Sequence, residues 1–295
     1  MKSDQHVEHV YFIRHNLKNQ RDVEMLERRK RVAIHFNREA FRKWDEYSSK
    51  SRRNKAFKRA WGYFQDIKKN GAIVVAQYAT GKYIIGRVKK GARIRFLAPR
   101  NAKGSRSLKT LKLLRTKKVS YTQFPIISII KPMFSTISPI RKNTQYVMYA
   151  YGLAPLTPSL ANMHYKLQET MCAEWLRSNH CPKAFRLDYL LANPGHGMEA
   201  VDILGRTKAG RKLFAQVTYS RGKRVLKKLR TLLAFSKGTG INIMFSNADL
   251  PPSDRSVRHV PLDQVWQELY SDRKYRGMLR EMIGIKSGKP RKSAA

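Results

Sequence analysis

The sequence predicts an α+β protein with several domains, in which N-terminal helices and a small β-barrel precede an α/β domain with a central mixed sheet. Three observations predict this class. The spacing of apolar residues changes near Gly71 from the three-and-four pattern of helices to the alternation of strands. About five short strand-like runs then crowd together, as in small barrels. After the proline-rich stretch YGLAPLTPS, strands alternate with helices.

We accordingly divide the chain into four segments. They are a basic helical region at 1–70, a small β-barrel at 71–150, an α/β domain at 151–285 and a basic tail at 286–295 that we expect to be disordered. In the first segment, apolar residues from Phe57 to Ile67 recur at helical spacing, and Gly71 suits the helix stop.

The barrel prediction depends on the runs AIVVAQY, KYIIGRV and ARIRFLA, which ATG and KKG separate as hairpin turns would. The runs LKTLKLL, KKVSYTQF and PIISIIKPMFSTISPI continue in the same manner. The layout GAIVVAQY…YIIGRV resembles the SH3-like or PUA-like barrels that precede nuclease domains in bacterial restriction and defence proteins. In the next segment we expect helix 159–178, strand 198–206, strand 212–220, helix 222–236, strand 240–246 and helix 262–270, with a central hairpin and a crossover helix.

Charge indicates the partner. The chain has 61 Lys and Arg against 20 Asp and Glu, a net charge of +41, and no acid occurs between Asp66 and Glu169. A field of one sign this large favours a polyanion, because each neutralised phosphate releases condensed counterions. We expect nucleic acid, with double-stranded DNA ahead of RNA. No apolar run is long enough to span a membrane, the N-terminus lacks a signal-peptide core, and Cys172 and Cys181 form no disulfide framework. We therefore expect a cytoplasmic protein, and leave a homodimer open.

Polar residues interrupt two strands that are otherwise apolar. Asp202 lies in the first strand of the hairpin, and Gln216 and Thr218 share one face of the second. If the strands pair, these groups meet at one end of the sheet, and a carboxylate beside an amide oxygen suits Mg²⁺ or Mn²⁺. Glu169, near the middle of the preceding helix, can supply a third group, with Glu174 as the competing acid.

A helix with Glu, a strand with Asp, a strand with a polar-x-polar pair and a basic helix together resemble the PD-(D/E)XK nuclease superfamily. The similarity is closest to Mrr-type restriction endonucleases and archaeal Holliday junction resolvases, in which a helix glutamate stands six residues before an apolar pair and a basic residue. Glu169 has that relation to Trp175–Arg177. The resemblance implies a restriction-endonuclease-like fold, a metal ion held by Asp202, Gln216 and Glu169, and hydrolysis of phosphodiester bonds in restriction, defence or repair.

Thr218 departs from the family pattern, which is (D/E)-x-K, or Q-x-K in Mrr-type members. The family lysine is thought to orient or activate the attacking water, which a threonine cannot do as a cation. A substitute would come from Lys223 or Lys227, or from Lys212, and we expect Lys223 to join the catalytic set of Glu169, Asp202, Gln216 and Thr218. The basic residues at the start of this helix, Lys223 included, are expected to contact DNA phosphates: Arg221, Lys223, Arg224, Lys227 and Lys228.

Two alternatives stay open from the sequence. The chain either hydrolyses DNA with a relocated cation, or keeps a nuclease fold as a catalytically degenerate DNA-binding protein. An RNA-associated basic protein is a third interpretation, which the charge alone would also favour.

Overall fold

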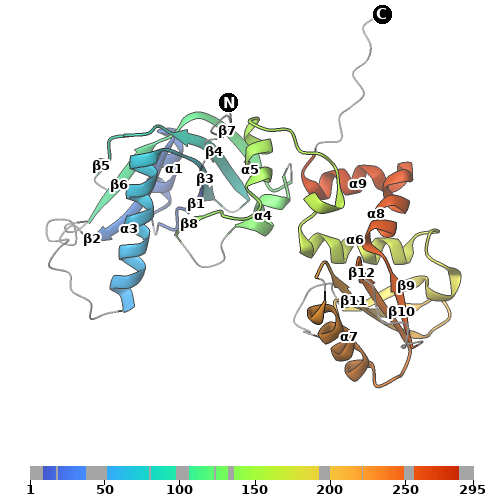
Figure 1. Cartoon of the computed structure of the whole chain (residues 1–295). Coiled ribbons are helices and arrows are strands. Elements are labelled where there is room, and N and C mark those ends of the chain that lie inside the picture. The colour runs from blue at the N-terminus through green and yellow to red at the C-terminus, as the bar shows by residue number, and fades with distance from the viewer. Residues whose placement is uncertain are drawn as a thin grey trace, which may run out of the picture. The chain divides into compact units, whose positions relative to one another are not determined.

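The computed structural model of the chain describes residues 9–17, 19–37, 52–79, 81–97, 106–122, 124–131, 136–192, 200–220, 222–248 and 256–285 (Figure 1). The chain divides into two units, Met1–Leu156 and Thr157–Ala295. The predicted tail at 286–295 lies outside the described residues. Among the helices of the described part, none combines the length and the apolar character needed to cross a membrane.

Unit 1, Met1–Leu156, contains two sheets. The first has the strand order β7-β4-β3-β1-β8 and the second has the order β2-β6-β5. The strands are β1 (Val10–Arg14), β2 (Arg31–Asn37), β3 (Ala72–Ala79), β4 (Lys82–Val88), β5 (Arg95–Leu97), β6 (Arg106–Lys112), β7 (Leu114–Ser120) and β8 (Ile137–Pro139). The helices are α1 (Gln20–Arg28), α3 (Arg52–Asn70), α4 (Ile126–Ile130) and α5 (Thr144–Tyr151).

The predicted helix at the end of the first segment is confirmed. In α3, Phe64 and Ile67 are fully buried, as their spacing requires. Gly71 ends the helix with a φ of +75°, and its N–H donates to the Ile67 carbonyl at 3.0 Å. A fully helical 1–70 is wrong, because β1 and β2 lie in it. Val10–Arg14 pairs in parallel with β3, which starts some 60 residues later in the chain, so local spacing could not reveal the strand.

The strands expected after Gly71 exist, but they do not form a barrel in the described residues. β3, β4 and β7 join one sheet, whereas β5 and β6 join the other. The run PIISIIKPMFSTISPI, expected to be extended, instead contains α4 and the short strand β8. Pro125 immediately precedes α4, where its fixed φ suits the start of a helix and overrides the β-branched composition of the run.

Unit 2, Thr157–Ala295, is built on one sheet with the order β13-β12-β11-β10-β9. Its strands are β9 (Leu187–Ala192), β10 (Ile203–Thr207), β11 (Lys212–Thr218), β12 (Ile241–Ser246) and β13 (Val257–Val260). Its helices are α6 (Tyr165–Arg177), α7 (Lys223–Ser236), α8 (Leu262–Ser271) and α9 (Arg273–Ile283), with 3₁₀ turns η2 (Leu160–Asn162) and η3 (Lys183–Phe185).

The topology confirms the central hairpin and the crossover helix. β9, β10 and β11 form an antiparallel meander, and Gly210, with a φ of +75°, makes the turn between β10 and β11. α7 then returns the chain so that β12 pairs in parallel with β11. β9, β13 and α9 are additional elements that the sequence did not predict.

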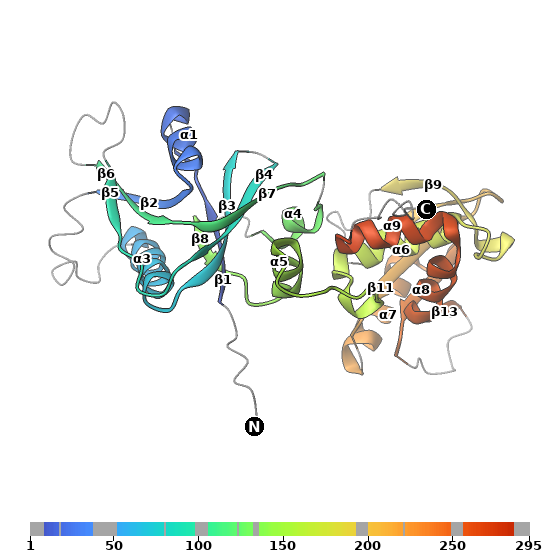
Figure 2. The same cartoon turned by 90° about the horizontal axis from the view of Figure 1, so that it is seen from above.

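α6 and α7 lie on opposite sides of this sheet (Figures 1 and 2). On the α6 side, Trp175 packs edge-to-face on Phe245, with ring centroids 5.8 Å apart. On the α7 side, Leu232 packs in a buried cluster with Val201 and Phe214. The central strands β11 and β12 are therefore covered on both faces.

Candidate active site

Asp202 is fixed at the entry to β10 by the backbone of the neighbouring strand. Its N–H donates to the Ala215 carbonyl at 2.9 Å. Because Ala215 is also the partner of Ile203, the β10–β11 register shifts by one residue here, as at a β-bulge. Its Oδ2 accepts a hydrogen bond from the Val217 N–H at 2.8 Å. The carboxylate is thereby held against the last residues of β11.

Lys228 reaches this carboxylate from the crossover helix α7. Its Nζ lies 3.9 Å from Asp202 Oδ2 and donates to the Val217 carbonyl at 3.1 Å. The Asp202 side chain is only 14% exposed, so water screens this ion pair less than it would a pair at the open surface. The ammonium is thus tied to both a carboxylate and a main-chain oxygen at the end of β11.

Glu169 on α6 belongs to the same electrostatic group. Burial, together with the nearby Asp202, raises the pKa of its carboxyl from 4.5 to about 7, while Lys228 and Lys166 oppose the shift. Burial also raises the pKa of Asp202, against the Val217 hydrogen bond and the Lys228 charge. Two half-buried acids and one amine, from three different elements, therefore act on one another.

A hollow of about 340 Å³ opens at this point. Its lining residues come from α6, from the end of β11 and from α7: Tyr165, Gln168, Glu169, Val217, Thr218, Tyr219, Ser220 and Lys228. The Thr218 hydroxyl faces its own turn, where it accepts a hydrogen bond from the Ser220 N–H at 3.1 Å. The hollow therefore presents carboxylate, hydroxyl, carbonyl and ammonium groups side by side.

Of the predicted catalytic residues, the structure brings Glu169 and Thr218 into this hollow and sets Asp202 beside its Lys228. Gln216 is 1% exposed and does not line the hollow. Alternation along β11 sets it on the same face as Phe214, towards α7. Lys223 is exposed at the start of α7 and does not line the hollow.

The remaining candidates lie elsewhere. Lys212 is at the other end of β11 from the site, and Glu174 forms a 2.8 Å ion pair with Arg177 on α6. Arg224 and Lys227 are exposed on α7. Arg221 is outside the described residues.

The sequence argument assigned Lys228 to phosphate contact and did not see it as the amine beside Asp202. A signal was present. Lys228 stands three residues after Val225 and four before Leu232, and both of these are buried. Lys228 therefore lies on the side of α7 that faces the sheet, where a lysine is usually paired with a nearby carboxylate or carbonyl. Lys227 lies outside that side of the helix.

The oxygen atoms of the site suit a hard divalent cation. The described residues hold no group of three or more His, Cys, Asp or Glu side chains that could bind a metal. Mg²⁺ needs fewer, because it is usually bound through one or two carboxylates and keeps several waters. Asp202, Glu169 and the Val217 carbonyl offer this set. Burial is the main cause of the raised pKa of both carboxyls, and a cation bound between them would favour their ionised forms.

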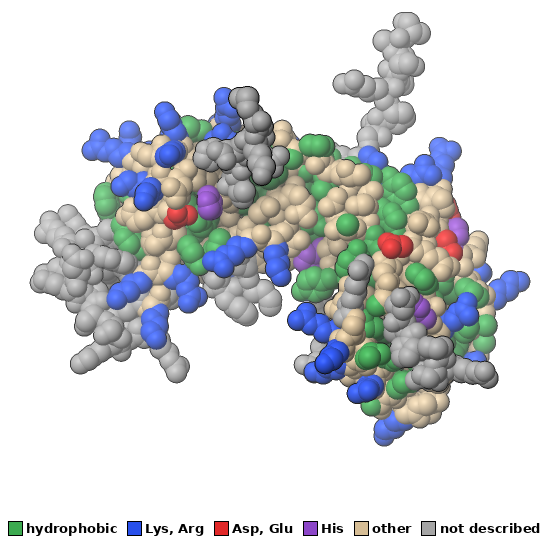
Figure 3. All heavy atoms as spheres, in the orientation of Figure 1, with side chains coloured by type: hydrophobic (Ala, Val, Ile, Leu, Met, Phe, Trp, Pro, Cys, Tyr) green, Lys and Arg blue, Asp and Glu red, His purple; other side chains and the backbone are tan. Residues whose placement is uncertain are grey.

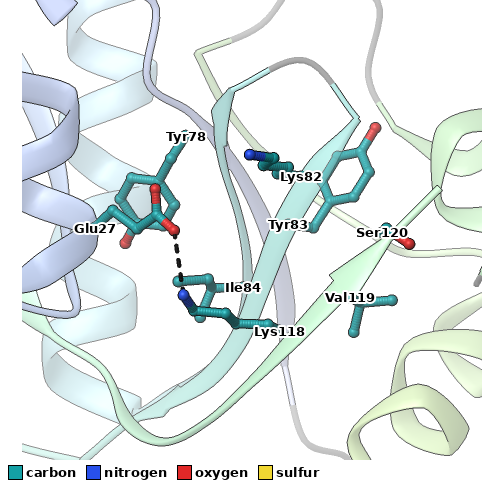
Figure 4. Close-up of a pocket in the computed structure, with 8 residues that line it drawn as sticks. All are labelled: Glu27, Tyr78, Lys82, Tyr83, Ile84, Lys118, Val119 and Ser120. Carbon is teal, nitrogen blue, oxygen red and sulfur yellow. Dashed lines mark ion pairs between the residues drawn. The ribbon is translucent and has the colours of Figure 1, made fainter.

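Unit 1 has a hollow of its own, of about 390 Å³ (Figure 4). Several of its polar groups are paired: Glu27 forms a 3.7 Å ion pair with Lys118, and the Tyr78 hydroxyl donates to the Arg31 carbonyl. Its lining includes a single carboxylate, so the paired acids of unit 2 make the stronger candidate for chemistry.

No family model matches the sequence, and no curated protein matches it. Two solved structures show a weak likeness. The EndoMS-dsDNA2 complex is 14% identical, with a TM-score of 0.23 over 61% of this chain and 73% of that one. The DNA modification-dependent restriction endonuclease AspBHI is 12% identical, with a TM-score of 0.23 over 86% of this chain and 79% of that one. A TM-score of 0.23 is too low for either likeness to indicate the fold or the function of this chain.

Proposed function

We propose that unit 2 is a divalent-metal-dependent endonuclease that hydrolyses phosphodiester bonds in DNA. One observation carries the proposal: Glu169 and Lys228, from two different helices, line one hollow, and Asp202 lies 3.9 Å from Lys228 and acts on Glu169. The resemblance to PD-(D/E)XK nucleases supports it, because the acids and the strand pair stand in the order that the resemblance implies.

In this proposal Asp202, Glu169 and the Val217 carbonyl hold Mg²⁺ or Mn²⁺. Gln216 stays a proposed further ligand, as the family resemblance implies. The bound ion supplies Lewis acidity and lowers the pKa of a coordinated water. Lys228 provides the positive charge that Thr218 cannot, and stabilises the negative charge that develops on the phosphate. The catalytic cation has thus moved from β11 to α7.

The basic surface supports DNA as the partner. Lys223, Arg224 and Lys227 are exposed on α7, the helix that also carries Lys228, and Arg221 precedes them in the chain. Lys and Arg side chains are spread over the visible face of each unit, where Asp and Glu are few (Figure 3). Such a surface follows the phosphate backbone and fixes its position without reading sequence. We propose double-stranded DNA as the substrate, in cytoplasmic restriction, defence or repair, as the family resemblance implies.

The test is nicking of supercoiled plasmid by the full chain, with Mg²⁺ or Mn²⁺ and with EDTA. Asp202→Ala is expected to abolish nicking. Asp188→Ala, which removes an exposed acid on β9, is the matched control and is expected to leave it intact. Nicking that survives in Asp202→Ala would overturn this site. If the chain nicks none of duplex, junction and modified DNA, the alternative is favoured: a DNA-binding protein without catalytic activity, as the threonine at position 218 also suggests.

A further inference from the structure

Two exposed tyrosines border the hollow. Tyr165 is the first residue of α6, one helical turn before Glu169, and Tyr219 directly follows Thr218 at the end of β11. Their exposed fractions are 61% and 50%, and both line the hollow. The Tyr165 ring also lies against the His164 ring, with centroids 4.3 Å apart, which supports it from one side.

Single exposed aromatic side chains are ordinary on protein surfaces. Tyr189 on β9, 47% exposed and away from the lining of the hollow, is one of them. Tyr165 and Tyr219 differ because separate elements deliver two rings to the hollow that holds both Glu169 and Lys228. Exposed aromatic rings beside cations form the combination with which proteins hold unpaired nucleotides.

A fully paired duplex gives these rings little to bind. Its bases already stack on one another, so rings beside the phosphate meet only sugar and backbone. A base that has left the helical stack, at a mismatch, a bubble or a single-stranded stretch, exposes a face that an aromatic ring can cover. Lys166 and Lys228, whose charges act on Glu169, would hold the adjoining phosphates.

We infer that the hollow takes duplex DNA with locally unpaired bases, which stack on Tyr165 and Tyr219. The inference about which DNA is cut rests on the proposed function, whereas the inference about which DNA is bound does not. It narrows the substrate class from any duplex to DNA whose bases are unstacked next to the hollow.

The experiment compares two labelled DNAs, a duplex with a short central bubble and the same duplex fully paired. Binding to the full chain is measured by fluorescence anisotropy at one fixed salt concentration, in EDTA so that no cleavage occurs. The wild-type chain is expected to prefer the bubble. Replacing both rings, Tyr165→Ala with Tyr219→Ala, is expected to reduce that preference by roughly 5- to 100-fold.

Two further variants separate stacking from other effects. Tyr165→Phe with Tyr219→Phe keeps the rings and is expected to keep the preference, whereas loss in this variant would overturn stacking in favour of hydroxyl contacts. Tyr189→Ala is the matched control and is expected to change nothing. A 2-aminopurine in the bubble should change its fluorescence on binding to the wild-type chain and not to the double alanine variant, because stacking on a ring alters its emission.

Equal affinity for the two DNAs overturns the inference, as does a preference that survives the double alanine variant or falls equally in Tyr189→Ala. Circular dichroism confirms that each variant is folded. Nicking with Mg²⁺ is measured separately. A bubble preference without nicking keeps the inference and rejects the endonuclease, whereas nicking without a preference does the reverse.

Discussion

The Lys228 ammonium lies 3.9 Å from the Asp202 carboxylate, although the two residues belong to a crossover helix and a strand entry. The same ammonium donates to the Val217 carbonyl, and the N–H of Val217 donates to Asp202. One residue of β11 thus connects the acid and the amine. A positive charge therefore lies at the end of β11, where Thr218 itself carries none.

Lys228→Ala is therefore expected to reduce the nicking rate by about 100-fold or more, the size of effect typical for loss of one preorganised charge. Lys227→Ala removes a neighbouring exposed lysine from the same helix and serves as the control, with a change of only a few fold. The measurement is the single-turnover nicking rate at saturating protein. Equal losses in both variants would indicate that α7 contributes DNA affinity alone.

Much of unit 2 could be predicted from the sequence, because its signals are local. The apolar alternation of β10 and β11, the turn at Gly210 and the buried stripe of α7 all lie within short windows. Pairing of those two strands brings Asp202 to the end of β11, where the Val217 N–H donates to its carboxylate. Its partner Lys228 could not be found in the same way, because that contact depends on how α7 crosses the sheet.

Unit 1 was less predictable for a related reason. The strand β1 pairs with β3 and β8, which lie far along the chain, so the local sequence carries no sign of either partner. The run at 126–140 is β-branched, yet Pro125 and the surrounding packing make α4 from its first residues. Local propensity yields to tertiary context in such short segments.

The raised pKa of Glu169 predicts how stability depends on pH in the absence of metal. Because its pKa rises from 4.5 to about 7, the fold favours the protonated carboxyl. Its stabilising contribution is complete below 4.5 and is lost as the pH rises through about 7. The melting temperature of unit 2 in EDTA should fall by a few degrees, relative to Glu169→Gln, across this window.

Calorimetric melts at a series of pH values measure this difference. Glu174→Gln, on the same helix and in a surface ion pair with Arg177, is the control and should follow the wild-type curve. A wild-type curve parallel to that of Glu169→Gln would show that the Glu169 carboxyl titrates as it does in water.

Divalent cations are expected to stabilise unit 2 through the same acids. Mg²⁺ or Mn²⁺ at about 100 times its dissociation constant should stabilise the fold by about 2.7 kcal/mol, because the ion binds the folded state alone. Asp202→Asn should remove the rise in melting temperature, and Asp188→Asn, on exposed β9, should retain it. The measurement is a calorimetric melt with and without the ion. A rise that persists in Asp202→Asn would place the ion elsewhere.

The exposed lysines of α7 should determine the salt dependence of DNA binding. Replacing Lys223 and Lys227 together by Ala removes two cations, and the slope of log affinity against log salt should become less steep by about 2, since each phosphate contact contributes about 0.9. Replacing Lys183 and Lys274, exposed cations of the same unit away from α7, is the matched control and should leave the slope unchanged. Fluorescence anisotropy across a salt series measures it. Equal slope changes in the two double variants would mean that the whole basic surface of unit 2, rather than α7, follows the phosphate backbone.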